Sequence, residues 1–389
     1  MRVLTRNAPM PEFAVPSPLE NASTQPGVAF SGEVFRLQRF GGASRMVLEL
    51  HRNLRACAVA TFISSKGSIS TMTDVADRLT DRTTFPYRWR GATHVANAVG
   101  RRADRTLLGA LTAPWIVHRS YFGPRLRINV PIVVTVYDMI AELYPESFPR
   151  TDPTPRHKSG SVREAALVFA ISETTKSDLI RLLDCDPRKI RVLPLGVNLP
   201  ADKAERQTAE REGLASKPYV LYVGQRGGYK NFATLVAAFR SPALNELDLV
   251  CFGGGSFTAD EVALLNRLSR DGRVRHVVGD DVLLGAFYRA AACFVYPSRY
   301  EGFGIPPLEA MVRGCPVVAS TGGSIPEVVG DAAELVDPDD AEGFGASIER
   351  VLTDDVRRRD LIFAGYARAA LYSWERTADV ALAAYRELI

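Results

Sequence analysis

The stretch RYEGFGIPPLEAMVRGCPVV, Arg299 to Val318, has the pattern of a loop, a short helix and a buried strand. The preceding apolar run, CFVYPS, has the composition of a parallel strand, and two glycines then interrupt it. Pro306 suits the first turn of a helix because it has no amide hydrogen, and Gly314 suits the position just after a helix ends. A second apolar run, CPVVAS, follows. The stretch therefore predicts a strand–helix–strand unit of a parallel sheet.

Two glutamates in this stretch stand eight positions apart, Glu301 in the predicted loop and Glu309 in the first turns of the predicted helix. The free amides around Gly304 and Ile305 would attract an anion, so a phosphate group could lie between the carboxylates. An alternative requires no function, because the helix dipole favours a glutamate early in a helix and an exposed loop glutamate is ordinary. Neither residue alone therefore establishes a site.

The length of 389 residues fits two α/β domains better than one core. Strand-like apolar runs alternate with helical segments in both halves, which is typical of doubly wound parallel sheets. The polar segment NLPADKAERQTAEREGLASKP is interpreted as the linker between them. We predict a flexible N-terminal extension (1–26), an N-terminal domain (27–198), a C-terminal domain (199–373) and a final amphipathic helix (374–389).

Composition disfavours several classes of protein. The five cysteines are scattered and form no C-x-x-C pair, so neither a disulfide framework nor a zinc site is indicated and a reducing cytosol is expected. No apolar run of about eighteen residues is present for a membrane span. The Pro-rich N-terminus lacks the apolar core of a signal peptide.

Charge is unevenly distributed along the chain. Residues 1–200 hold 27 Lys and Arg against 17 Asp and Glu, a balance of +10, whereas the remainder holds 21 against 27, a balance of −6. A basic front half suits an anionic partner or a membrane surface. Scattered arginines are also ordinary on protein surfaces, so peripheral contact with an anionic membrane is only an expectation.

A second candidate site lies in the segment VGQRGGYKN, residues 223–231. A predicted strand ends at Gly224, and Arg226 and Lys230 follow in a glycine-bearing loop. Ligands of parallel sheets bind outside the carboxyl ends of the strands, where this loop and the Glu301 loop both fall. Two cations with helix amides can neutralise a diphosphate without a metal ion. Solvated loop charges are the alternative, but the coincidence of the two loops favours a site.

Several segments together resemble one known family. They are EGFGIPPLE, VGQRGGYKNF, FRLQRFGGASRMVLEL, TVYDMIAELYPESF and TGGSIPEVVGDAAELVDPDD. The chain resembles the retaining GT-B glycosyltransferases of family 4, most closely the mannosyltransferase-B-like branch that builds bacterial surface polysaccharides, from about Val28 to its end. The resemblance implies an α/β fold of two doubly wound, Rossmann-like domains that face each other across a cleft, with the C-terminal helix crossing back to the N-terminal domain.

The resemblance implies a role for each matching residue on the donor side. Arg226 and Lys230 would bind the nucleotide diphosphate and stabilise it as it leaves. Glu301, the third implied catalytic residue, would contact hydroxyls of the transferred sugar, and Glu309 would accept hydrogen bonds from the ribose hydroxyls. Neighbouring loop residues would complete the donor site, at Gly224, Gly279, Gly302, Phe303, Gly304 and Ile305.

On the acceptor side, the resemblance implies that Gly41 and Gly42 let the N-terminal loop approach the donor phosphate and the acceptor, which a Cβ would obstruct. Asp138 is an implied orienting group. Many relatives have histidine where this chain has Tyr137, which is a departure from the family pattern. His118 could occupy the cleft instead, or could be a satisfied histidine at a strand end.

The implied activity is transfer of a hexose, with retention of configuration, from a nucleotide diphosphate sugar to a glycan or lipid-linked oligosaccharide in surface polysaccharide synthesis. The donor is GDP-mannose or else a UDP-sugar. A front-face mechanism would need no protein nucleophile, metal or other cofactor. Nucleic acid is not expected among the partners. The implied location is the cytoplasm, at the inner face of the membrane. Two alternatives stay open: an epimerase of the same fold, which would need no acceptor, and a non-catalytic partner subunit.

Overall fold

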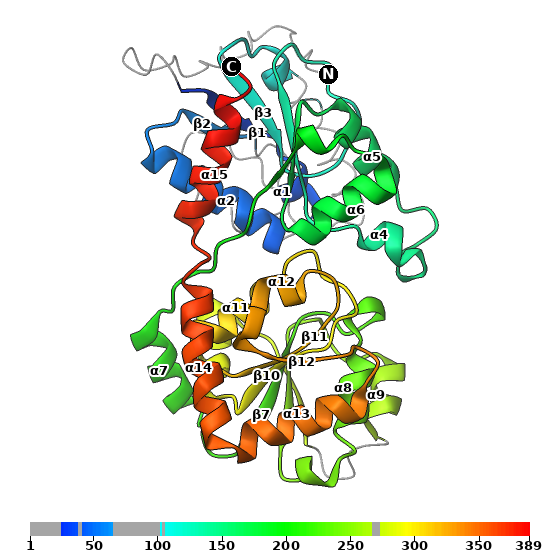
Figure 1. Ribbon diagram of the computed structural model, residues 1–389, viewed down its shortest axis with the longest axis vertical. Coiled ribbons are helices and arrows are strands. Elements are labelled where there is room, and N and C mark those ends of the chain that lie inside the picture. Colours follow the sequence, from blue (N-terminus) through cyan, green and yellow to red (C-terminus); the bar gives the residue numbers. More distant parts are fainter. Residues whose placement is uncertain (1–24, 38–40, 65–101, 103–105, 267–272) are drawn as a thin grey trace, which may run out of the picture.

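The chain forms two lobes, one above the other in Figure 1, and each lobe is built on a parallel sheet. The predicted extension at residues 1–26 falls almost entirely outside the described residues. The computed structural model describes residues 25–37, 41–64, 102, 106–266 and 273–389.

The N-terminal sheet has the strand order β2-β1-β3-β4-β5-β6, with every pair parallel. Strands β3 and β4 are buried along their whole length, as expected where helices cover both faces of a parallel sheet. The strands are β1 Gly27–Phe30, β2 Thr61–Ile63, β3 Trp115–Arg119, β4 Ile132–Val136, β5 Leu167–Ala170 and β6 Ile190–Val192. The helices are α1 Glu33–Leu37, α2 Gly42–Ala56, α4 Ile140–Leu143, α5 Thr154–Glu164 and α6 Glu173–Leu183, with short 3-10 turns η2 Pro145–Ser147 and η3 Pro187–Lys189.

The C-terminal sheet has the order β12-β11-β10-β7-β8-β9 and is also parallel throughout. Its strands are β7 Tyr219–Val223, β8 Asp248–Phe252, β9 Val274–Val277, β10 Cys293–Tyr296, β11 Val317–Ser320 and β12 Glu334–Val336. The helices are α7 Asp202–Arg211, α8 Phe232–Ala238, α9 Ala259–Asn266, α10 Asp281–Ala290, α11 Ile305–Met311, α12 Ile325–Val329, α13 Ala341–Thr353 and α14 Asp355–Ala369, with short 3-10 turns η4 Gly228–Lys230, η5 Pro242–Leu244 and η6 Gly330–Ala332.

Local signals in the sequence explain where several helices begin and end. The Ser172 hydroxyl accepts a hydrogen bond from the Thr175 amide at 3.0 Å and caps α6. Pro306 lies in the first turn of α11, and Gly314, with φ of +71°, follows that helix as predicted. The motif stretch is therefore strand β10, loop, helix α11 and strand β11, which confirms the predicted unit.

The C-terminal helix returns to the N-terminal lobe. Helix α14 packs on the lower lobe and α15, Trp374–Arg386, packs against α2 of the upper lobe (Figure 1). The returning chain lies against the segment that follows β6: the Trp374 indole donates to the Asn198 side-chain oxygen at 2.7 Å, and the Val197 amide donates to the Tyr372 carbonyl at 3.1 Å. The two-domain fold with a crossing C-terminal helix is thereby confirmed, while the limits of the domains stay a prediction.

The interpretation of residues 198–218 as a linker was wrong for most of the segment. It contains helix α7, which packs against α10. Its Glu205 is 1% exposed and accepts hydrogen bonds from Arg289 and Arg313 at 2.9 and 2.8 Å. The segment looked solvated because the partners of its buried carboxylate are arginines 84 and 108 residues away, which composition does not show.

Candidate active site

The motif loop lies at the junction of the lobes. The Gly302 carbonyl accepts a hydrogen bond from the Thr175 hydroxyl of α6 at 3.3 Å, and the Tyr300 hydroxyl donates to the Asp178 carboxylate at 2.6 Å. In the same region, the Glu327 carboxylate of α12 accepts hydrogen bonds from the first amides of α6. Helix α6 of the upper lobe is therefore docked against the loop that carries Glu301.

Lys230 and Glu301, predicted from separate segments, form an ion pair of 2.7 Å between Nζ and Oε1. Burial is the largest influence on the pKa of Lys230 and disfavours its charge, but attraction to Glu301 and Tyr229 outweighs burial and raises that pKa. The ammonium is therefore charged at neutral pH. A partly buried, charged group in the loop that follows β7 can stabilise negative charge that develops in a reaction.

Gly302 permits a close approach between the lobes. A Cβ at this position would lie 1.7 Å from the Tyr137 carbonyl oxygen and 3.0 Å from the Asp138 Cβ. The Asp138 carboxylate accepts a hydrogen bond from the amide of Ile140, the first residue of α4, at 3.0 Å. The structure thus brings Asp138, predicted on the acceptor side, against the loop that holds Glu301.

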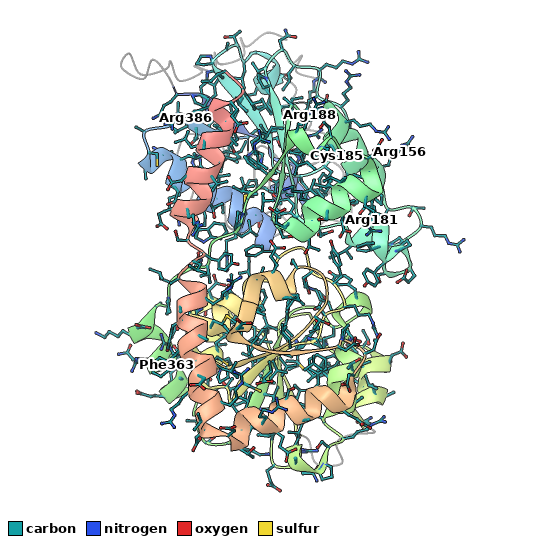
Figure 2. All side chains as sticks on the ribbon, in the orientation of Figure 1. Arg156, Arg181, Cys185, Arg188, Phe363 and Arg386 are labelled. Carbon is teal, nitrogen blue, oxygen red and sulfur yellow. The ribbon has the colours of Figure 1, made fainter. Side chains whose placement is uncertain are left out.

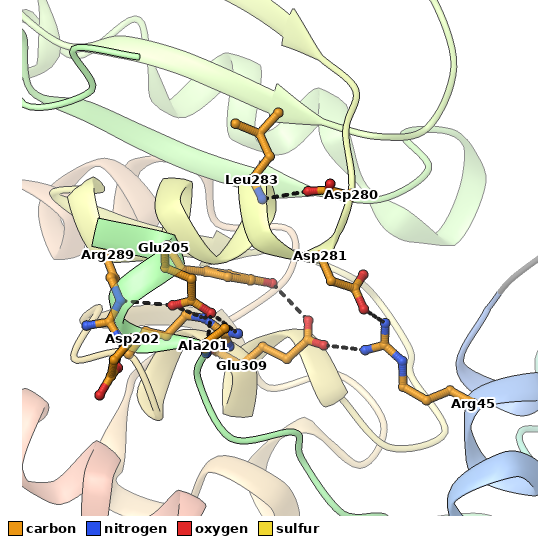
Figure 3. A network of polar contacts seen from close by, with 11 residues as sticks. Arg45, Ala201, Asp202, Glu205, Asp280, Asp281, Leu283, Arg289 and Glu309 are labelled. Atoms are coloured by element: carbon orange, nitrogen blue, oxygen red, sulfur yellow. Dashed lines mark hydrogen bonds and ion pairs between the residues drawn. The ribbon is translucent and has the colours of Figure 1, made fainter. Parts of the chain in front are cut away.

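Glu309 lies on α11 and is almost buried (Figure 3). Its Oε1 accepts a hydrogen bond from Arg45 Nη1 at 2.9 Å, and its Oε2 is 3.4 Å from the Tyr288 hydroxyl. The pKa of Glu309 is raised because burial, the largest influence, outweighs the attraction of Arg45 and Arg313. A pocket of about 110 Å³ opens beside this carboxylate. Its lining includes Arg45, Glu205, Asp281, Tyr288, Glu309 and Arg313.

Arg45 is a site residue that sequence reasoning missed. It lies in the first turns of α2, three positions after Gly42, and also donates to Asp281 at 2.6 Å (Figure 3). The sequence contains one indication of a role for Arg45, its position on the helix that follows the predicted glycine loop. Because residues three apart share a helix face, a side chain at this position points toward the same side as the loop.

Arg226 is held by contacts with another loop of the same lobe. Its side chain is buried: Nε donates to Glu261 at 3.0 Å, and the two terminal nitrogens donate to carbonyls of residues 253–256. The guanidinium also lies over the Phe257 ring, 4.6 Å from its centroid. These contacts hold the loop after β8, and the contact of Arg226 with a diphosphate stays a prediction.

His118 needs a correction as an acceptor-side residue. It is fully buried, with Nδ1 2.6 Å from the Tyr385 hydroxyl and Nε2 2.8 Å from the Thr135 hydroxyl. Burial lowers the pKa of His118 from 6.5 to about 3, so the ring is neutral. The satisfied-histidine interpretation is the one that agrees with the structure. Tyr137 likewise points inward, donating to the Ser120 carbonyl at 2.9 Å.

The predicted glycines have different surroundings. Gly41 precedes α2 with extended backbone, and a Cβ on Gly42 would make only ordinary contact, 3.8 Å from Ile305 Cδ1. At the end of β7, Gly224 has φ of +115°, which few other residues adopt. A Cβ on Gly279 would lie 2.3 Å from the Leu283 side chain. Two remaining donor-side positions, Phe303 and Gly304, lie in the loop before α11, where Gly304 has φ of +121°.

Within the described ranges, no group of three or more His, Cys, Asp or Glu is placed to hold a metal ion. In that same part of the chain, no helix has the length and apolar character needed to cross a bilayer.

Comparisons with known proteins agree with the geometry. The family described as Glycosyltransferase Family 4 matches residues 40–200, and that described as Glycosyl transferases group 1 matches residues 205–368. An O-antigen chain mannosyltransferase B from Escherichia coli is 34% identical over 282 residues, which cover 69% of this chain and 74% of that protein.

Solved structures show the same fold. The sucrose-phosphate synthase of Thermosynechococcus elongatus superposes with a TM-score of 0.71 and 25% identity, covering 94% of this chain and 99% of the other. Anabaena Alr3699/HepE in complex with UDP-glucose gives a TM-score of 0.69 at 18% identity, with 91% and 98% covered.

Two facing parallel-sheet lobes, with a lysine–glutamate pair where they meet, define a GT-B glycosyltransferase. The chain belongs to the group 1, family 4 glycosyltransferases, and its relatives include mannosyltransferases of O-antigen synthesis.

Proposed function

We propose that this glycosyltransferase moves a hexose, favouring mannose from GDP-mannose, to a glycan or lipid-linked oligosaccharide acceptor with retention of configuration. The observation that carries the proposal is the Lys230–Glu301 ion pair, followed eight residues on by the nearly buried Glu309. One cation and two carboxylates suit the three parts of a nucleotide sugar: diphosphate, hexose and ribose.

The proposed reaction uses this chain's groups to bind and orient. Lys230 neutralises the diphosphate as the bond from the sugar C1 to the phosphate oxygen breaks. The acceptor oxygen forms a new bond to C1 on the same face, and its proton passes to the departing diphosphate oxygen. Glu301 orients the hexose hydroxyls, and Asp138 on the facing lobe orients the acceptor. No protein nucleophile is assigned, and Lys230 takes the place of a metal ion.

Mannose is favoured because the curated relative at 34% identity is described as an O-antigen chain mannosyltransferase. A UDP-sugar is the second candidate, since the structurally similar Anabaena protein was solved with UDP-glucose. For the acceptor, a lipid-linked oligosaccharide at the inner face of the cytoplasmic membrane fits the basic front half of the chain. Figure 2 shows Arg156, Arg181 and Arg188 at the surface of that lobe.

The test is a screen of the full chain against GDP-mannose, UDP-glucose and other nucleotide sugars by thermal unfolding. A ligand raises the unfolding temperature according to its concentration over its dissociation constant. The stabilising donor is then incubated with and without a lipid-linked mannan fragment, and the anomeric configuration of the product is read by NMR. Consumption of donor sugar without acceptor, through epimerisation, would overturn transfer, and so would failure of all donors to bind.

A further inference from the structure

Arg45 joins the N-terminal lobe to the carboxylate assigned to the ribose. From α2 it donates to Glu309 at 2.9 Å and to Asp281 at 2.6 Å (Figure 3). Among ion pairs of the described residues, these two link the N-terminal lobe with residues 199–373. The arginine therefore makes a bidentate bridge from the upper lobe to α10 and α11 of the lower lobe.

The surroundings of Glu309 make a cation necessary. Its side chain is 12% exposed, and burial disfavours the charged carboxylate. The Asp281 carboxylate repels the charged form of Glu309. The Tyr288 hydroxyl is 3.4 Å from Glu309 Oε2, which is long for a hydrogen bond. Two cations oppose these influences: Arg45, and Arg313, which follows α11 and is shared with Glu205 of α7. Arg45 is the one whose position depends on the arrangement of the lobes.

The hydrogen bonds divide the two oxygens of Glu309. Arg45 contacts Oε1, whereas among the described residues Oε2 has only the 3.4 Å contact with the Tyr288 hydroxyl and can accept further hydrogen bonds. A ribose diol binds best to a carboxylate that is ionised and whose free oxygen faces the ligand. Arg45 supplies both conditions, and it supplies them only while α2 is close to α11.

We propose that Arg45 is a positioning residue that makes the ribose-binding carboxylate competent when the lobes close. It fixes one oxygen of Glu309, keeps that group ionised and leaves the other oxygen for the ribose hydroxyls. This inference rests on the proposed function. By linkage, a nucleotide that binds Glu309 more tightly in the closed arrangement must also favour closure.

The test is calorimetric binding of GDP and UDP to the full chain between about pH 5 and pH 8, which spans ionisation of a carboxyl group whose pKa is raised. In the wild type, affinity is lost as pH falls through the pKa of Glu309. In Arg45→Met that pKa is higher, so the loss begins at higher pH, and affinity at neutral pH is about tenfold or more lower. The matched control is Arg52→Met on the same helix, whose ion pair with Glu49 is exposed and should not affect binding.

A second pair of variants separates positioning from general damage. Glu309→Gln cannot ionise at this position, so adding Arg45→Met to it should cause no further shift of the pH profile. Arg45→Lys keeps the charge and should restore much of the profile, which a merely structural role would not require. Thermal unfolding of each variant checks its folding.

Each outcome is decisive. Wild-type binding with an unchanged affinity and pH profile in Arg45→Met overturns the role of Arg45 and leaves the proposed function standing. A wild type that binds neither GDP nor UDP overturns the proposed function itself. An Arg45→Met shift that persists in the Glu309→Gln background also overturns the inference, because Arg45 would then act on another group.

Discussion

Lys230 and Glu301 meet through an ion pair of 2.7 Å although they come from loops 71 residues apart in the chain. Their strands, β7 and β10, are neighbours in the C-terminal sheet, so the carboxyl ends of both strands present their loops at one edge. The pair holds a cation next to the place proposed for the diphosphate and keeps that cation charged.

Replacing Lys230 by Ala should lower turnover by about a hundredfold or more, the scale for losing a group that stabilises charge in the transition state. The measurement is the initial rate of transfer at saturating donor. Lys203→Ala, at an exposed position of α7, is the control and should keep the wild-type rate. If Lys230 replaces a metal ion, activity should also survive EDTA. Complete loss on chelation, with recovery on adding Mg²⁺ or Mn²⁺, would contradict this assignment.

The buried, neutral His118 should make the folded chain less stable as the pH falls. Its pKa is lowered to about 3 in the folded chain from 6.5, so unfolding takes up a proton and the stabilisation present above pH 6.5 is lost as pH falls. Between pH 7 and pH 5 this group should cost about 2 kcal/mol of unfolding free energy. Urea unfolding at both pH values, compared with His118→Gln, measures the difference. An equal loss in wild type and variant would show that His118 does not contribute.

The basic front half should bind anionic lipid. Each well-placed Lys or Arg contributes roughly 1 kcal/mol near an anionic surface, and salt screens the attraction. The chain should therefore co-sediment with vesicles that contain phosphatidylglycerol, less so as salt rises, and not with neutral phosphatidylcholine vesicles. Equal recovery in the supernatant under all conditions would refute peripheral attachment by charge.

Much of the fold was predictable because its signals are local. Apolar runs gave the strands, and Ser172, Pro306 and Gly314 marked the starts and ends of helices. The Glu301 and Lys230 loops were placed together correctly because parallel strands bring their carboxyl ends to one edge.

The contacts that sequence reasoning missed are all non-local. Arg226 is expected from the sequence to be a solvated or ligand-binding loop cation. In the structure it donates to backbone carbonyls of a different loop, and residue types alone do not reveal where those carbonyls point. Glu205 has the composition of a solvated segment around it, but Arg289 of α10 and Arg313, just after α11, form its ion pairs. Arg45 meets Glu309 across 264 positions, a contact that arises only when the lobes meet.

Gly302→Ala should act on the approach of the lobes more than on folding. A Cβ would lie 1.7 Å from the Tyr137 carbonyl, so the loop and the upper lobe must separate. A displacement of about 1 Å at a reacting centre can cost about a hundredfold in rate, and we expect at least that loss of transfer. Gly227→Ala, where a Cβ has no neighbour within 4 Å, is the matched control. Thermal unfolding should change little in either variant, and small-angle scattering should show a more open Gly302→Ala chain. A fully active Gly302→Ala would contradict the need for this contact.

Glu301 and Glu309 should fail in different ways if they divide the donor between them. A hydrogen bond between a hydroxyl and a carboxylate is worth about 1.5 to 3 kcal/mol, which corresponds to roughly ten- to a hundredfold in affinity. Glu309→Ala should lower the affinity for free nucleotide by that factor. The variant should bind the nucleotide and its 2′,3′-dideoxy analogue with nearly the same affinity. Glu301→Ala should bind free nucleotide normally, because free nucleotide has no hexose, and should lose affinity or turnover with the complete donor.

The measurement is a double-mutant cycle between each glutamate and the donor hydroxyls, with dissociation constants from calorimetry. The cycle for Glu309 should show coupling to the ribose hydroxyls, and the cycle for Glu301 should show none. Because Glu301 also pairs with Lys230, Glu301→Gln is the control that keeps the shape of the side chain while removing its charge. If both alanine variants lose free nucleotide equally, the division is wrong, and the two carboxylates act together to hold the loop before α11 in shape.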